Sequence, residues 1–279
     1  MLKIAVPNKG SLAETAAQML AEAGYHGRRD PKELIVADPA NGVEFFYLRP
    51  RDIATYVGSG ALDVGVTGRD LLLDSHSKAR EIEDLGFARS TFRFAGPVGR
   101  FQELGDLQGK RIATSYESLV GDFLAEAGIT ADIVHLDGAV ESAVRLGVAD
   151  AVADVVETGS TLKKQGLEIF GPVILESSAV LVTADQDIPG LAKLQRRLQG
   201  VVVARQYVLL DYDLPKRLLE QATAIAAGFE SPTVSPLQDP EWVAVRVMLP
   251  RKGVNGVMDD LYELGARAIL VTPIAAARI

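Results

Sequence analysis

One short segment near the middle of the chain combines the residue types that bind a phosphate group. It follows an apolar run, residues 151–156, that is typical of a buried parallel strand. A helix is expected to begin near Leu162, so its first backbone N–H groups are left unpaired beside the segment's hydroxyl groups. A phosphate placed there would gain hydrogen bonds and the favourable end of the helix dipole. The segment consists of Thr158, Gly159, Ser160 and Thr161.

Two acidic residues stand directly before this segment. Asp154 and Glu157 would repel a phosphate, but their oxygens can accept hydrogen bonds from the hydroxyl groups of a sugar. A phosphate-binding turn beside two such acceptors suits a ribose 5-phosphate. The alternative is an ordinary capped turn between a strand and a helix, with both acids simply solvated.

Residues 157–162, preceded by Asp150 and Asp154, resemble the phosphoribosyl-pyrophosphate loop of the ATP phosphoribosyltransferase family, which catalyses the first step of histidine biosynthesis. The family usually has threonine where Ser160 stands, a difference that keeps the hydroxyl group. The resemblance covers the whole chain and includes Val-Pro-Asn-Lys-Gly at residues 6–10 and the turn at residues 230–233. On this resemblance, the residues expected to bind phosphoribosyl pyrophosphate are Glu141, Asp154, Glu157, Thr158, Gly159, Ser160, Thr161 and Leu162.

The resemblance implies that N1 of the ATP adenine displaces pyrophosphate from C1 of phosphoribosyl pyrophosphate, with Mg²⁺ carried on the pyrophosphate. Such a displacement passes through an oxocarbenium-like state and mainly requires aligned partners and a neutralised leaving group. No protein nucleophile is needed, which agrees with a chain that has no cysteine and three histidines. No residue is singled out as a direct metal ligand.

Basic residues recur at strand-to-helix junctions in the first part of the chain. Lys9, Arg49 and Arg69 each follow an expected strand, and such junctions border the ligand crevice of an open α/β sheet. Together with the neighbouring Asp70, they are predicted to contact ATP and pyrophosphate. The alternative for each basic side chain is a solvated position in a loop.

Two blocks of sequence occur twice in the same order. Leu-Ala-Glu-Ala-Gly stands at residues 20–24 and again at 124–128, and a Gly-x-x-Asp block at residues 60–66 has a counterpart at 147–153. Chance similarity in alanine-rich sequence is the alternative. The matched order favours two similar α/β lobes.

Facing lobes with a cleft between them form the type II periplasmic binding proteins, and the catalytic part of the resembled family has a similar fold. We therefore expect an α/β chain with lobe I in residues 1–90 and 180–205 and lobe II, with the phosphoribose loop, in residues 91–179. The chain should cross between lobes near residues 88–97 and 172–183. Glu141 is expected to start a helix of lobe II and face the cleft, or only to favour the helix dipole.

Residues 206–279 show the order strand, helix, strand, strand, helix, strand of a ferredoxin-like domain. Before it, we expect a short helix at residues 191–197 and β-forming sequence from residue 201. The resemblance implies an ACT-like regulatory domain that binds histidine as a feedback inhibitor, with Asp213 and Thr233 at the effector. The alternative is that Asp213 caps a helix and Thr233 is an ordinary strand residue.

Composition restricts the remaining possibilities. The absence of cysteine excludes disulfides and thiolate nucleophiles, and the net charge of −8 argues against a nucleic-acid partner. No apolar run approaches the about 20 residues that span a bilayer, so a cytoplasmic protein without a membrane partner is expected. The resemblance implies homodimers that assemble into homohexamers. A solute-binding or sensor module of the same fold is the main alternative. A DNA-binding regulator is disfavoured because this sequence shows no basic helix-turn-helix.

Overall fold

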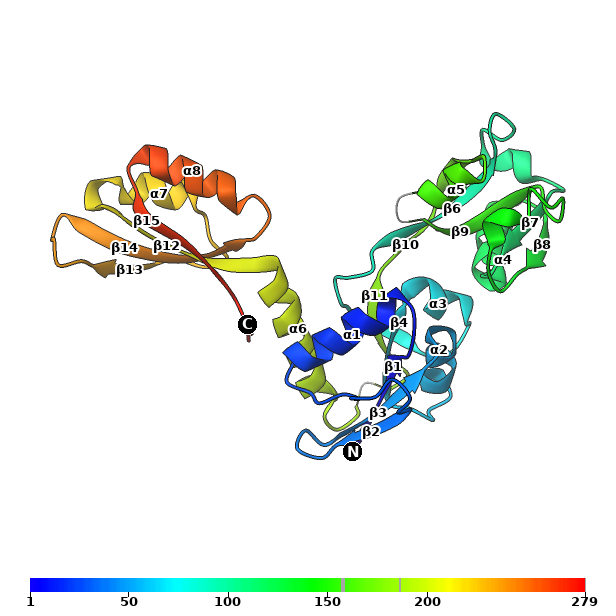
Figure 1. Cartoon of the computed structure of the whole chain (residues 1–279), viewed down its shortest axis with the longest axis horizontal. Helices are drawn as coiled ribbons and strands as arrows, with labels where there is room; N and C mark the ends of the chain where they lie inside the picture. Colours follow the sequence, from blue (N-terminus) through cyan, green and yellow to red (C-terminus); the bar gives the residue numbers. More distant parts are fainter. Residues whose placement is uncertain (157–158, 186, 279) are drawn as a thin grey trace. The chain divides into compact units, whose positions relative to one another are not determined.

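A computed structural model describes residues 1–156, 159–185 and 187–278 (Figure 1). Within these residues the strands form three sheets joined by helices, so the expected α/β fold is confirmed. The chain divides into two compact units. Unit 1 comprises Met1–Ala21 and Tyr25–Ala192, and unit 2 comprises Glu22–Gly24 and the chain from Lys193 onward.

Lobe I, in unit 1, is built on a sheet with the strand order β2-β3-β1-β4-β11-β5. Strands β1, β3 and β4 are parallel, whereas β11 is antiparallel to both of its neighbours. The strands are β1 (Leu2–Pro7), β2 (Ile35–Asp38), β3 (Val43–Leu48), β4 (Val64–Gly68), β5 (Arg80–Asp84) and β11 (Ala179–Thr183). Helices α1 (Ser11–Glu22), α2 (Pro50–Gly58) and α3 (Arg69–Asp74) follow β1, β3 and β4.

Lobe II, also in unit 1, is built on a sheet with the order β10-β6-β9-β7-β8. Here β7 is parallel to β8 and β9, and β6 is antiparallel to β9 and β10. The strands are β6 (Ser90–Pro97), β7 (Arg111–Thr114), β8 (Asp132–His135), β9 (Ala151–Val156) and β10 (Leu167–Ser177). Its helical elements are η1 (Leu104–Leu107), α4 (Glu117–Glu126), η2 (Val140–Ser142) and α5 (Ser160–Lys164).

The repeated sequence blocks occupy equivalent places in the two lobes. The first block closes α1 and α4, and its glycine has a left-handed backbone in both, with φ of 83° at Gly24 and 70° at Gly128. The second block leads into β4 and β9. Aligned on these matches, the lobes share the orders β3-β1-β4-β11-β5 and β8-β7-β9-β6-β10, which confirms the prediction of two similar lobes.

The aspartate of the second block has the same structural task in each lobe. Asp63 Oδ2 accepts the backbone N–H of Lys3 at 2.7 Å, and Asp150 Oδ2 accepts that of Arg111 at 3.1 Å. Both carboxylates thus hold the start of the lobe's first parallel strand. The aspartate that precedes the phosphoribose loop in sequence, Asp150, is therefore part of the scaffold of lobe II.

The chain crosses between the lobes twice. It leaves β5 to enter β6 of lobe II, and it returns from β10 through Ser178 to β11. Strand β11 then lies between β4 and β5, so the sheet of lobe I contains a strand from far along the sequence.

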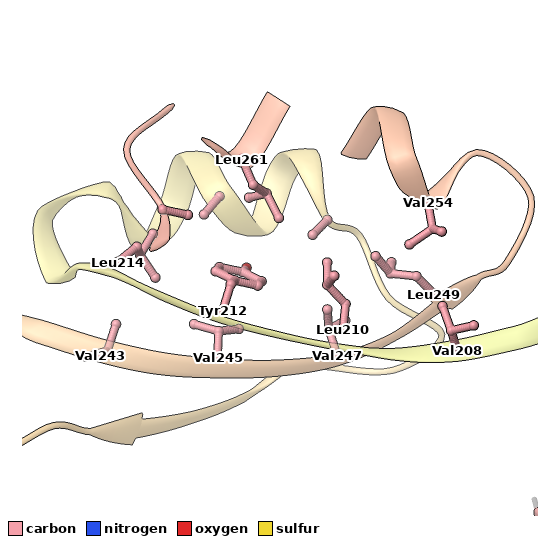
Figure 2. Packing of buried hydrophobic residues seen from close by; sticks show 13 residues of the cluster. Val208, Leu210, Tyr212, Leu214, Val243, Val245, Val247, Leu249, Val254 and Leu261 are labelled. Atoms are coloured by element: carbon pink, nitrogen blue, oxygen red, sulfur yellow. The ribbon is translucent and has the colours of Figure 1, made fainter. Parts of the chain in front are cut away.

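Unit 2 contains a ferredoxin-like domain. Its sheet has the order β13-β14-β12-β15, and helices α7 and α8 cover one face (Figure 1). Alternate residues of β12 and β14 are buried, and Figure 2 shows Leu210, Tyr212 and Val245 packed on that face with Leu261 of α8. The elements are β12 (Tyr207–Pro215), η3 (Lys216–Leu218), α7 (Leu219–Ile225), β13 (Thr233–Pro236), β14 (Trp242–Pro250), α8 (Val254–Leu264) and β15 (Arg267–Pro273).

The segment before this domain differs from the prediction. Helix α6 spans Leu191–Gln206, whereas we expected a helix ending at residue 197 and a strand from residue 201. Gly200 lies inside the helix, and only glycine fits there because a β-carbon would collide with the backbone oxygen of Ala277. Val201 is buried, so packing outweighs the β propensity of the valine run. Among the helices of the described residues, none is long and apolar enough to cross a membrane.

Candidate functional site

A cavity of about 560 Å³ in unit 1 is lined by residues from both lobes. Its lobe I side is formed by the loops that follow the neighbouring strands β1 and β3, so the carboxyl ends of parallel strands supply it, as an open α/β sheet requires. The lobe II side contributes one aromatic and one acidic residue. The lining residues are Lys9, Gly10, Ser11, Leu12, Arg49, Pro50, Arg51, Asp52, Leu71, Tyr116 and Asp137.

Two of the three predicted basic residues meet in this cavity. Lys9 follows β1 in a loop whose Gly10 has φ of 79°, and Arg49 stands at the N-cap of α2 with Pro50 after it. Arg51, in the first turn of α2, adds a third positive charge that the sequence reasoning overlooked. The signal was available, because Arg51 lies two residues after Arg49 in the same junction. Three cations on one wall suit a polyphosphate.

The structure places Arg69 outside this cavity, at another cavity of about 380 Å³ that Val156 and Ser177 also line. Its Nε and Nη2 donate to the two carboxylate oxygens of Glu81 at 2.8 and 2.7 Å, and Nη2 lies 3.4 Å from Asp84. The guanidinium also donates to the backbone oxygen of Glu176 at 3.1 Å. These partners, Glu81 foremost, raise the pKa of Arg69. Its charge is thus neutralised where β5 and β10 approach α3.

Asp70 is buried and has specific partners. Ser177 Oγ donates to Asp70 Oδ1 at 2.9 Å, and the backbone N–H of Asp70 donates to Ser177 Oγ at 3.2 Å. Burial first, and then the charge of the nearby Asp70, raise the pKa of Tyr116, so the phenol keeps its proton. Asp70 therefore favours the neutral form of Tyr116 across the lobes.

A second, narrower cavity of about 180 Å³ adjoins these residues and shares Ser11, Leu12, Leu71 and Tyr116 with the first. Its walls combine three branched aliphatic side chains and one aromatic ring with four serines and Asp70, so apolar surface and hydrogen-bonding groups are both available to a flat heteroaromatic base. Sequence reasoning missed Tyr116. The repeat pointed to it, because the loop after β7 that carries Tyr116 is equivalent to the loop after β1 that carries Lys9.

Asp154 lies on β9 of lobe II and is half-buried. Burial raises its pKa to about 6, a hydrogen bond from the backbone N–H of Val155 at 2.8 Å opposes this, and the charges of Glu141 and Asp70 raise it further. The charged form of a carboxylate that is partly removed from water is stabilised by hydrogen bonds from hydroxyl groups or by a nearby cation. Glu141 is close enough to act on Asp154, but it lies in the 3₁₀ turn η2 instead of the expected helix start.

The predicted phosphoribose loop belongs only in part to the described residues. Glu157 and Thr158 lie outside the described residues, so their predicted roles stay predictions. Gly159 has φ of 69° at the N-cap of α5, and Ser160 and Thr161 are exposed in the first turn of that helix. The side chain of Leu162 packs in the lobe II core, so a contact with phosphate would come from its backbone N–H.

The two residues predicted to bind an effector lie apart on the sheet of unit 2. Thr233 is paired with Arg246, which pairs with Asp211, whereas Asp213 pairs with Ala244. Thr233 lines a cavity of about 390 Å³, and Asp213 is not among its lining residues, which are Leu209, Phe229, Glu230, Ser231, Thr233, Arg246, Val247, Met248 and Arg278. Asp213 does not cap a helix either, since η3 and α7 have no side-chain cap in the described structure.

No group of three or more His, Asp or Glu side chains in the described part of the chain could hold a metal ion by itself. Asp70 and Asp154 come from opposite lobes, and the charge of Asp70 acts on Asp154, so these two carboxylates could contribute oxygen ligands. Mg²⁺ is commonly bound by one or two carboxylates together with substrate phosphates, and this pair fits that pattern.

Comparison with known proteins places the chain in a family. The model of the ATP phosphoribosyltransferase family matches residues 49–200, and that of the HisG C-terminal domain matches residues 204–276. An ATP phosphoribosyltransferase from Arthrobacter sp. (strain FB24) is 63% identical over 286 residues, and one from Streptomyces coelicolor is 59% identical over 285 residues. Both matches cover 100% of this chain and 100% of the relative.

Solved structures agree with this relationship. The ATP phosphoribosyl transferase (HisG:HisZ) complex from Thermotoga maritima aligns with a TM-score of 0.64 and 29% identity, over 72% of this chain and 98% of that chain. The GluR0 ligand-binding core from Nostoc punctiforme, with a TM-score of 0.50 and 15% identity over 71% and 92%, shares the two-lobed fold alone. Because full-length relatives are 59% and 63% identical and both family models match, the chain belongs to the ATP phosphoribosyltransferase family of enzymes.

Proposed function

We propose that this enzyme transfers the phosphoribosyl group of phosphoribosyl pyrophosphate to N1 of ATP, as the first step of histidine biosynthesis. The N1 lone pair forms a bond to C1 of the ribose, the C1–O bond to pyrophosphate breaks, and the bonding electrons leave with the pyrophosphate. The observation that carries the proposal is the cleft cavity, which has three cations on its lobe I wall and Tyr116 and Asp137 on the lobe II side.

The basic wall supplies the electrostatic part of the reaction. Lys9, Arg49 and Arg51 are placed to bind the phosphates of the nucleotide and the departing pyrophosphate. Negative charge builds up on the pyrophosphate as the C1–O bond breaks, and fixed cations stabilise that charge without reorganising. Their contribution should therefore appear in both substrate affinity and turnover.

The narrower cavity is the proposed site of the adenine. Leu12, Leu71 and Tyr116 form apolar walls for the base, and the guanidinium carbon of Arg51 lies 4.9 Å from the centre of the Tyr116 ring. Holding the base in one orientation aligns N1 with the sugar and removes the entropic cost of that alignment from the reaction step.

The ribose is proposed to bind on lobe II. Asp154 and Glu157 accept hydrogen bonds from its hydroxyl groups, with Glu141 close by, and residues 158–162 receive the 5-phosphate. The half-buried Asp154 supports this role because sugar hydroxyls would supply the donors that its carboxylate lacks. Mg²⁺ is proposed to accompany the pyrophosphate, where it would offset charge on the leaving group, with Asp70 and Asp154 as available oxygen donors.

The ferredoxin-like domain is the proposed site of feedback inhibition by histidine. An amino acid presents an ammonium and a carboxylate, and the cavity of unit 2 offers both Glu230 and Arg246, next to Thr233. Asp213 does not line this cavity, because it lies two residues beyond Asp211, the strand partner of Arg246. Its contact with the effector therefore stays a prediction. Assembly into homodimers and homohexamers and a cytoplasmic location complete the proposal.

The decisive experiment is an assay of pyrophosphate release with ATP, phosphoribosyl pyrophosphate and Mg²⁺. We expect release that requires both substrates, a product whose mass equals ATP plus phosphoribosyl, and inhibition by histidine. Binding of one ligand without pyrophosphate release would favour the solute-binding alternative. For the residue assignment, Glu157→Ala and Thr161→Ala should weaken binding of phosphoribosyl pyrophosphate, and unchanged affinity in both variants would contradict it.

A further inference from the structure

Asp74, the last residue of α3 in lobe I, makes contacts with lobe II. Its Oδ1 accepts the backbone N–H groups of Ser118 and Leu119, both at 3.1 Å, while its Oδ2 lies 2.9 Å from Arg51 Nη1. The carboxylate is only 10% exposed, so solvent screens these contacts weakly. Ser118 and Leu119 belong to the first turn of α4.

Helix α4 has no cap of its own. Its N-cap position is occupied by Tyr116, whose side chain makes no capping hydrogen bond. Asp74 satisfies two of the first-turn N–H groups instead, and its negative charge lies at the positive end of the helix dipole. A residue of lobe I thus caps a helix of lobe II.

The same carboxylate is connected to the cavity wall. Arg51, its ion-pair partner, lies with its guanidinium carbon 4.9 Å from the centre of the Tyr116 ring, and both residues line the cavity. Asp74, Arg51 and Tyr116 therefore form a continuous series of contacts from lobe I to lobe II.

We propose that Asp74 is a positioning residue for the nucleotide substrate. It touches neither substrate; it fixes the start of α4, and with it Tyr116, against Arg51, so that the walls proposed to receive ATP are held together although they belong to different lobes. This inference rests on the proposed function. It predicts that damage at Asp74 affects ATP more than phosphoribosyl pyrophosphate, whose ribose and 5-phosphate are proposed to bind on lobe II and whose pyrophosphate alone reaches the basic wall of lobe I.

Two substitutions separate the cap from a general loss of stability. Asp74→Ala removes both contacts and should raise KM for ATP about fivefold to tenfold, the factor that corresponds to loss of one helix cap. KM for phosphoribosyl pyrophosphate should stay within about twofold. Asp74→Asn keeps an oxygen that can cap α4 and should recover most of the ATP affinity, because asparagine caps helices about as well as aspartate.

A second contact between the lobes provides the matched control. His76 Nε2 and Asp122 Oδ2 lie 2.7 Å apart and join the segment after α3 to α4, but the side chains are 56% and 61% exposed. Asp122→Asn should leave both KM values unchanged. An Asp122→Asn effect equal to that of Asp74→Ala, an Asp74→Asn variant no better than the alanine, or equal rises in both KM values would overturn the proposal.

A measurement without turnover keeps this test independent of the proposed reaction. The chain has no cysteine, so Lys78→Cys in lobe I and Glu126→Cys in lobe II, both at exposed positions, provide unique sites for a pair of spin labels. Asp74→Ala should broaden the distance distribution between the labels, whereas Asp122→Asn should not. An unbroadened distribution in Asp74→Ala would overturn the proposal, while absence of pyrophosphate release by the unmodified enzyme would contradict only the proposed function.

Discussion

Lobe I and lobe II share one strand order, but the residues at the ends of their strands differ in charge. The loops after β1 and β3 in lobe I carry Lys9, Arg49 and Arg51, whereas β9 and η2 in lobe II carry Asp154 and Glu141. The residues that recur in both lobes hold the backbone in place. They include Asp63 and Asp150 and the glycines after α1 and α4. Repetition therefore marks the scaffold, and departure from repetition marks the proposed chemistry.

The largest expected effect comes from breaking the basic wall of lobe I. Arg49→Ala should lower kcat/KM by roughly 10²- to 10³-fold, because a preorganised charge on the leaving group is lost. Arg69→Ala is the matched control. It should leave KM for ATP nearly unchanged but lower the free energy of unfolding by about 2 kcal/mol, since Glu81 loses its partner. Equal losses of ATP affinity in both variants would contradict the assignment; initial rates and denaturant titration measure the two effects.

On the lobe II side, Asp154 should show opposite effects on activity and stability. Asp154→Asn should weaken binding of phosphoribosyl pyrophosphate by roughly 10- to 30-fold, the factor expected when a charged acceptor is lost. Activity of the unmodified enzyme should fall as the pH drops through about 6, where this carboxylate takes up its proton, and the variant should lack that change. A pH profile with the same acid limb in both proteins would contradict the role.

The stability of the same variant follows from linkage. The pKa of Asp154 is raised in the folded chain, so between its ordinary value of 3.8 and about 6 the folded state binds more protons than the unfolded state. Stability must then increase as the pH falls through this window. At neutral pH, Asp154→Asn should raise the free energy of unfolding by about 1 kcal/mol, after allowance for partial exposure. Thermal unfolding at pH 5 and pH 7.5 tests the sign.

The smallest effects on catalysis should come from the repeated aspartates. Asp63→Asn and Asp150→Asn should each lower the free energy of unfolding by roughly 1 to 2 kcal/mol while changing KM little. Asp150→Asn should cost more, because Asp150 also pairs with Arg111 at 3.2 Å. A strong and selective rise in KM for phosphoribosyl pyrophosphate in Asp150→Asn would show that this residue belongs to the site.

Local patterns predicted the fold well and the site in part. The recurring blocks and the alternating strands of unit 2 are short-range signals, so two lobes and a ferredoxin-like domain could be predicted from them. Arg69 could not be placed in this way. Its partners Glu81 and Asp84 lie on β5, which reaches β4 only through β11, a strand about 100 residues later in the sequence. Contacts made across the lobes, such as those of Asp74 with the start of α4, leave no periodic signal.

Helix α6 shows the limit of intrinsic propensity. A glycine followed by three valines indicated a helix end and a strand, but Gly200 is needed where the backbone near Ala277 approaches, and Val201 is buried. Close approach and burial are properties of the folded chain, and they outweigh the local preference.

The position of β11 has a consequence for biosynthesis. While the ribosome is still extending the chain through lobe II, β4 and β5 of lobe I lack the strand that must lie between them. Lobe II contains all of its own strands in one uninterrupted stretch from Ser90 to Ser177, so it can close first. The lobe made first is therefore completed last, and until residues 179–183 emerge its nascent sheet is open to chaperones or to mispairing.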